Sequence, residues 1–186
     1  MRLFIAIEIP ADIRNALMAF LNELRGTAPR AKWVHAENLH VTLKFLGESD
    51  PGKLPTVEKA LSSIHDHDPV ALNFRGLSFF PNERRPRVFW VGMEASGNLQ
   101  TLAEVIDREM HKLGFPLENR AFTPHLTLAR FEPPGIPPQL GASVKSNATR
   151  EFGSLTTEDF HLIESKLKRT GAEYTTVQSY RFVART

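Results

Sequence analysis

A short motif occurs twice in this chain and constrains its fold more than any other feature. His-x-Thr-Leu is found at 40–43 and again, 85 positions later, at 125–128. The same spacing relates Arg-Leu-Phe-Ile at 2–5 to Arg-Val-Phe-Trp at 87–90. Two separate matches that share one spacing indicate a duplicated half, which is much longer than the unit of a solenoid repeat.

The duplication predicts two similar halves, about 1–85 and 86–170, related by an approximate two-fold axis. The chain has 186 residues, which is the size of one domain or of two closely packed lobes. Hydrophobic residues make up 41% and charged residues 24%, as is usual for a globule with a core. Because no linker or low-complexity segment divides it, we expect 1–186 to form a single domain.

Charge and cysteine content exclude several classes of protein. The net charge is only +2, so contact with RNA or DNA would have to come from a local basic patch. The chain has no cysteine, which excludes disulfides, thiolate metal sites and cysteine nucleophiles. No apolar run approaches the length of a membrane span, and residues 3–9 have the pattern of a first strand. We expect a cytoplasmic protein with no membrane contact.

Hydrophobic periodicity predicts alternating strands and helices. Strands are expected at 3–9, 39–46, 70–74, 77–80, 87–93, 122–130, 160–163 and 174–182. Helices are expected after Pro10, over 54–64 and over 99–113, with Gly26 ending the first in the left-handed conformation and Gly114 closing the third. Residues 139–152 give no clear pattern. Short turns join several strands, which favours an α+β fold with largely antiparallel sheets.

The strand expected at 39–46 should present its polar residues on one face. Strict alternation places His40, Thr42, Lys44 and Leu46 together, and turns Leu39, Val41, Leu43 and Phe45 toward the core. In the same way, His125 and Thr127 alternate with Leu126 and Leu128. Each half therefore supplies one histidine with a threonine beside it.

Two such pairs suit the chemistry of a phosphodiester. In-line transfer needs a base for the attacking oxygen and an acid for the leaving oxygen, and imidazole titrates in the required range. The hydroxyls of Thr42 and Thr127 can donate to the non-bridging oxygens, where charge gathers in the transition state. One His-x-Thr alone would be read as an ordinary polar pair on a half-exposed strand; two in register favour catalysis.

With these motifs and flanks the chain resembles the 2H phosphoesterase superfamily, and within it the RNA 2′,3′-cyclic phosphodiesterases, also called 2′-5′ RNA ligase-like (LigT or ThpR) proteins. The resemblance rests on the segments 2–6, 40–47, 87–90 and 124–130, and so covers most of the chain. It implies a bilobal fold with two pseudo-symmetric halves and an active-site cleft between them. It also implies a hydrolase that needs neither metal nor cofactor.

The resemblance further implies that the substrate is an RNA or nucleotide with a terminal 2′,3′-cyclic phosphate, opened to a 2′-phosphate, and that the reverse reaction would form a 2′-5′ linkage. Position by position, His40 would be the proton donor and His125 the proton acceptor. Thr42, Thr127 and Arg130 would bind the phosphate. The two motifs are chemically alike, so the residues themselves leave the choice of acid and base open. We expect a monomer.

Other candidates have simpler explanations. The run His65-Asp66-His67-Asp68 reads as a solvated helix end better than as a metal site. Arg84, Arg85 and Arg87 fit a surface turn and an RNA-backbone contact equally well. Phe45 and Trp90 are expected in the core more than in a base stack.

Two alternative functions remain open at this point. One is a non-catalytic nucleotide- or RNA-binding module that kept the cleft. The other is a related phosphodiesterase for a small cyclic or 2′-5′ nucleotide. Binding without product formation would favour the first, and equal rates on mononucleotides and oligonucleotides would favour the second.

Overall fold

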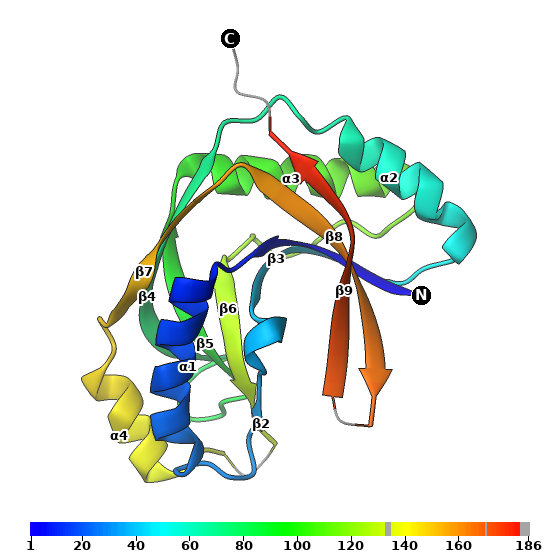
Figure 1. The fold of residues 1–186 in the computed structure, drawn as a ribbon. Coiled ribbons are helices and arrows are strands. Elements are labelled where there is room, and N and C mark those ends of the chain that lie inside the picture. The colour runs from blue at the N-terminus through cyan, green and yellow to red at the C-terminus, as the bar shows by residue number, and fades with distance from the viewer. Residues whose placement is uncertain (133–134, 170, 183–186) are drawn as a thin grey trace.

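The computed structural model describes residues 1–132, 135–169 and 171–182, and within them the strands form two antiparallel sheets (Figure 1). The first sheet has the order β3 (His40–Glu48), β1 (Arg2–Glu8), β8 (Asp159–Lys168), β9 (Gly171–Arg181). The second has the order β2 (Lys32–Trp33), β6 (His125–Arg130), β5 (Val88–Ala95), β4 (Val70–Phe80), β7 (Glu151–Thr157). The expected α+β fold with antiparallel sheets is confirmed.

Helices cover both sheets (Figure 1). The first helix of each half packs on the sheet that does not contain the motif strand of that half. The helices are α1 (Ala11–Arg25), α2 (Leu54–Ser62), α3 (Gly97–Lys112) and α4 (Pro138–Ser146), with short 3-10 turns at η1 (Ala36–Asn38) and η2 (Pro51–Lys53). The helix that follows β1, α1, packs against β7 of the second sheet. The helix that follows β5, α3, packs against β3 of the first sheet. One continuous apolar core joins the two lobes.

The predicted elements are largely confirmed, with differences at four places. The helix α1 buries the expected stripe that includes Leu17 and Phe20, but Gly26 has φ −63° and is right-handed. Thr27 explains this, because its amide and hydroxyl both donate to the carbonyl of Leu24, at 2.9 and 2.7 Å. The carbonyl of Leu24 at the end of the helix thus has hydrogen-bond donors without a left-handed residue. Gly114, which follows the third helix as expected, has a positive φ of 88°.

The other differences concern strands. The two strands expected at 70–74 and 77–80 form one strand, β4, with an irregularity at 75–76 where Gly76 has φ +79°. The unassigned region 139–152 forms most of α4 and the start of β7. Strict alternation along β3 is wrong after Thr42, because the pairing with β1 shifts between Thr42 and Lys44. Lys44 and Leu46 are buried as a result, and Phe45 is 65% exposed.

Candidate active site

The two motif strands occupy equivalent positions in the two sheets. Strand β3 pairs with β1 in the first sheet, and β6 pairs with β5 in the second, so each motif strand lies beside the strand that carries the second repeated segment. The pairing shifts at the same point in both strands, at Leu43 in β3 and at Leu128 in β6. Such an extra residue is a β-bulge, which bends the strand and redirects the side chains that follow it.

The bulges determine which side chains share the face of the histidines. In β3 the half-buried His40 and Thr42 alternate with a buried valine, and after the bulge the next exposed residue is Phe45. In β6 the next exposed residue after His125, Thr127 and the bulge is Arg130. Phe45 and Arg130 are therefore equivalent positions of the duplication, and both return to the face that carries the motif.

Each histidine is oriented by the same local contact. Nδ1 of His40 lies 2.7 Å from the carbonyl oxygen of Asn38, and Nδ1 of His125 lies 2.8 Å from that of Thr123. A carbonyl can only accept, so Nδ1 carries the proton in both rings and Nε2 is left to exchange a proton with a ligand. The residue two positions before each histidine thus selects the tautomer that acid–base chemistry needs.

The two rings differ in their surroundings. His40 is packed against the rings of Phe4 and Tyr174, with centroid distances of 4.6 and 5.2 Å. Burial lowers the pKa of His40 to about 4, although its bond to Asn38 and the charge of Glu8 oppose this effect. His125 is exposed, and the ring of Trp90 lies 6.1 Å away. His40 is therefore neutral at pH 7 in the ligand-free protein.

A cavity of about 400 Å³ brings the two motifs together. Thr42 of the first motif and His125 of the second both line it, along with aromatic side chains that come from both sheets. The rest of the lining consists of Leu43, Lys44, Phe45, Phe80, Val88, Trp90, Glu118, Arg120, Ala121, Phe122 and Thr123. This volume is within the usual range of small-molecule sites, and an apolar wall with a few polar groups is typical of them.

Arg130 acts across the two lobes. Burial raises the pKa of Tyr174, and the positive charges of Arg130 and Arg2 oppose this effect. Arg130 is on β6 in the second sheet, while Tyr174 is on β9 in the first and contacts His40. The guanidinium of Arg130 is thus close enough to influence the surroundings of His40 electrostatically, which fits the expectation that it lies near the phosphate site.

Comparison with known proteins places this fold and site in a family. The model of the LigT-like phosphoesterases matches the chain twice, over residues 7–90 and 91–174. The chain belongs to the LigT-like phosphoesterase family. The resemblance noted in the sequence is thereby confirmed, and the two matches repeat the duplication seen in the motifs.

Two relatives of this LigT-like chain are similar to it over nearly their whole length. It is 36% identical to the RNA 2′,3′-cyclic phosphodiesterase of Archaeoglobus fulgidus, covering 94% of this chain and 96% of that one, and 32% identical to that of Methanothermobacter thermautotrophicus, covering 97% and 98%. Among solved structures, a Thermus thermophilus protein superimposes with a TM-score of 0.80 at 31% identity, covering 98% of both chains. Escherichia coli LigT complexed with 3′-AMP gives 0.76 at 28% identity, covering 97% of both.

Several residues near the site of this LigT-like phosphoesterase were not identified from the sequence. Tyr174 lies on β9, far along the chain from the His40 that it contacts, so no local pattern links the two. Phe80 and Phe122 line the cavity but look like ordinary strand and loop residues in the sequence. The assignment of Phe45 to the core was wrong, because the bulge turns its ring outward into the cavity. Trp90 is half-buried and also lines the cavity.

The basic turn lies next to this cavity. Arg84 and Arg85 are exposed between β4 and β5, and Asn82 holds the turn by accepting from both of their amides, at 3.0 and 3.1 Å. Arg87 is exposed immediately before β5. Phe80, which lines the cavity, immediately precedes the turn.

The run from His65 to Asp68 has a structural role at His67. Its ring is buried against Phe182, with centroids 5.1 Å apart, and its Nδ1 lies 2.8 Å from the carbonyl oxygen of Asp68. Within the described ranges, no group of three or more metal-ligating side chains is found. In the same part of the chain, no helix is long and apolar enough to cross a membrane.

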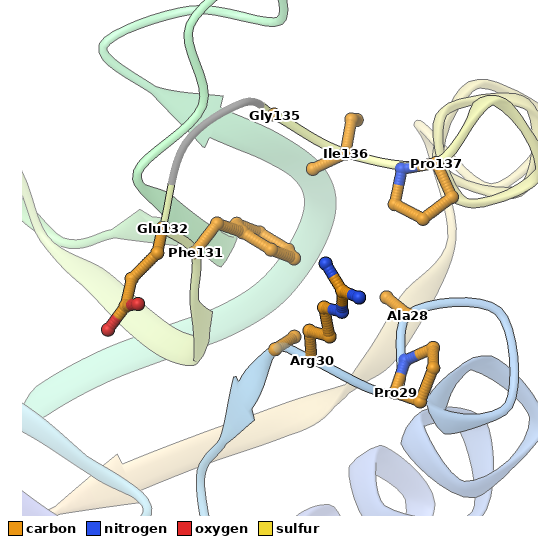
Figure 2. A pocket seen from close by; sticks show the side chains of 9 residues that line it. Ala28, Pro29, Arg30, Phe131, Glu132, Gly135, Ile136 and Pro137 are labelled. Carbon is orange, nitrogen blue, oxygen red and sulfur yellow. The ribbon is translucent and has the colours of Figure 1, made fainter.

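A larger cavity, of about 540 Å³, lies away from the motifs (Figure 2). It is formed where residues 28–31, before β2, meet residues 131–132 and 135–137. Figure 2 shows the guanidinium of Arg30 between Phe131 and Pro137. None of the predicted site residues lines this cavity.

Proposed function

We propose that this protein is an RNA 2′,3′-cyclic phosphodiesterase that opens a terminal cyclic phosphate to a 2′-phosphate by two-histidine acid–base catalysis. The observation that carries the proposal is the paired geometry. His40 and His125 lie on equivalent strands, and each has Nδ1 bound to the carbonyl two residues before it, which leaves Nε2 for the substrate. The relatives named as RNA 2′,3′-cyclic phosphodiesterases support the same reaction.

In the proposed mechanism, Nε2 of His125 takes a proton from the attacking water while Nε2 of His40 gives a proton to the departing 3′ oxygen. The hydroxyls of Thr42 and Thr127 donate to the non-bridging oxygens, and Arg130 adds positive charge as the phosphorane forms. Because His40 is neutral in the free protein, its role as donor requires that the bound phosphate, an anion, raise its pKa. With the 5′-hydroxyl of a second RNA in place of water, the same two groups would form a 2′-5′ linkage, because the hydroxyl oxygen bonds to phosphorus as the bond to the 3′ oxygen breaks.

The nucleoside next to the phosphate is proposed to occupy the cavity beside His125. Phe45 and Phe80 are 65% and 53% exposed there, and exposed rings on two sides of a cavity suit a stacked base. Neither catalytic histidine needs a metal in this scheme, and no cofactor is required. We further propose that the protein acts as a cytoplasmic monomer.

The test is turnover of a short RNA that ends in a 2′,3′-cyclic phosphate, followed by separation of 2′- and 3′-phosphate products. His40→Ala and His125→Ala are each expected to lower kcat by about 100- to 10,000-fold while the melting curve still shows a folded protein. Wild-type turnover is expected to be unchanged in EDTA. Full activity in either variant, a 3′-phosphate product, or a strict need for metal would contradict the proposal.

The assignment of acid and base has its own test. Replacing the bridging 3′ oxygen by sulfur gives a leaving group that needs no proton. If His40 is the donor, this substrate restores turnover in His40→Ala much more than in His125→Ala. The opposite pattern would exchange the two roles. Binding of the RNA without product at any pH would instead favour a non-catalytic binding module.

A further inference from the structure

We propose that the buried ion pair between Lys44 and Asp107 is a positioning device that holds the loop leading into His125, and so fixes the second histidine relative to the strand of the first. The inference rests on the proposed function. Lys44 lies on β3, two residues after Thr42, and its side chain is only 5% exposed. Its ammonium contacts the carboxylate of Asp107 on α3.

The pair is connected to the loop that follows α3. The ammonium of Lys44 also donates to the carbonyl oxygen of Pro116 at 2.8 Å. The carboxylate of Asp107 accepts from the amide of Glu118, with both oxygens at 3.3 Å. The two charged side chains thus bind one backbone group each from the loop, and together they hold residues 116–118 against the motif strand of the other half.

The same loop forms a wall of the site and orients the second histidine. Residues 118 and 120–123 line the cavity that contains His125. At the end of the loop, the carbonyl oxygen of Thr123 accepts from Nδ1 of His125. A connected path therefore runs from Lys44 through Asp107 and the loop to the ring of His125, whereas His40 is oriented separately by Asn38.

The duplication shows that the strand does not need a lysine here. Ala129 occupies the equivalent position of β6, one residue after the bulge, and is fully buried. A buried ion pair is a poor source of stability, because removing the two charges from water costs about as much as their attraction returns. The buried lysine is present in only one of the two copies. It is explained better as the group whose hydrogen bonds hold the loop in place.

The test uses Lys44→Met/Asp107→Leu, which replaces the pair by apolar side chains and avoids leaving one buried charge unpaired. Asp107→Asn, which keeps the shape of the carboxylate, is the second variant. Lys32→Met removes an exposed lysine that contacts Glu132 beside β6, and serves as the matched control. We expect kcat to fall by about 30- to 100-fold in both pair variants, because a displacement of about 1 Å costs this much, and to stay at the wild-type value in the control.

A readout independent of catalysis completes the test. The chain has no cysteine, so spin labels can be attached at Asn119→Cys in the loop and Lys59→Cys on α2, which are both exposed. The distribution of distances between the labels is expected to be narrow with the pair intact and broader in Lys44→Met/Asp107→Leu. A folded double variant with wild-type kcat, or with an unbroadened distribution, overturns the inference. If the wild type itself lacks activity, the proposed function fails, and the label distances still decide the role of Lys44.

Discussion

His40 and His125 belong to equivalent strands and make equivalent hydrogen bonds, yet their surroundings differ. His40 is enclosed by Phe4 and Tyr174, and burial lowers its pKa from 6.5 to about 4. His125 is exposed at the mouth of the cavity. The buried ring is the proposed proton donor, so its protonation depends on the anionic phosphate that binds beside it.

The lowered pKa of His40 predicts a pH-dependent stability. Between pH 4 and 6.5 the unfolded chain binds a proton at His40 that the folded protein does not, so stability rises with pH across this window and is lost as the pH falls. The full effect is about 3 kcal/mol, at about 1.4 kcal/mol per pKa unit. His40→Gln is expected to flatten the pH dependence of urea unfolding measured at pH 4.5 and 7. His65→Gln, at an exposed position, is the control, and an unchanged pH dependence in His40→Gln would contradict the account.

At the scale of elements, the paired bulges decide what faces the cleft. Without the extra residue at Leu43 and Leu128, the alternation of each strand would bury Phe45 and Arg130 and expose Lys44 and Ala129. With it, an aromatic ring and a guanidinium follow the two motifs on the same face. Identical bulges in both copies also explain why the motif reads His-x-Thr-Leu in each, since the leucine is the bulged residue that stays in the core.

The turn between β4 and β5 leads to a prediction about RNA binding. Among the described residues no ion pair involves Arg84 or Arg85, and the carboxylate of Glu83 is paired with Lys145 at 3.6 Å. A nucleic-acid chain that leaves the cavity past Phe80 would meet these guanidinium groups. Arg84→Gln/Arg85→Gln is expected to raise KM for an RNA of about six nucleotides and to reduce the slope of log KM against log salt by about one.

Two comparisons make this prediction specific. The same double variant is expected to leave KM for a mononucleotide 2′,3′-cyclic phosphate unchanged, because a single nucleotide does not reach the turn. Lys53→Gln/Lys112→Gln removes two exposed charges, one before α2 and one at the end of α3, and is expected to leave both substrates unaffected. If the arginine variant and the wild type have equal KM values for the RNA, the turn has no part in RNA binding.

At the scale of the whole molecule, the duplicated halves are interdependent. The central strand β1 of the first sheet pairs with β8, which comes from the second half. The helix α1 packs on β7 of the second sheet, and α3 packs on β3 of the first (Figure 1). The apolar core includes residues of both lobes without a break. We therefore propose one folding unit, in contrast to two repeats that could be separated.

This arrangement predicts that neither half folds alone. Residues 1–85 lack β8, which is one of the two partner strands of β1, and the strand β7 against which α1 packs, so the fragment is expected to be unfolded by circular dichroism and to give an undispersed amide spectrum. Mixing it with residues 86–186 is expected to restore helical signal and some phosphodiesterase activity. A dispersed spectrum from 1–85 by itself would show two independent domains instead.

The sequence alone was sufficient for features that are local or repeated. Alternation and helical periodicity placed most strands and helices, and the repeated His-x-Thr singled out two strands and their polar face before any contact was known. The prediction from sequence failed at the two bulges, because period-two reasoning assumes that no residue is left unpaired. It also failed at Gly26, where the bonds from Thr27 to Leu24 end the helix instead of a left-handed glycine.

Tertiary structure alone decided the features that depend on distant segments. The low pKa of His40 follows from Tyr174 on the last strand and Phe4 on the first. The anchoring of the His125 loop follows from Asp107 on a helix that crosses to the other lobe. Composition and spacing identify the proposed reacting groups, but their burial, and with it the lowered pKa of His40, is set only when strands remote in the sequence pack against each other.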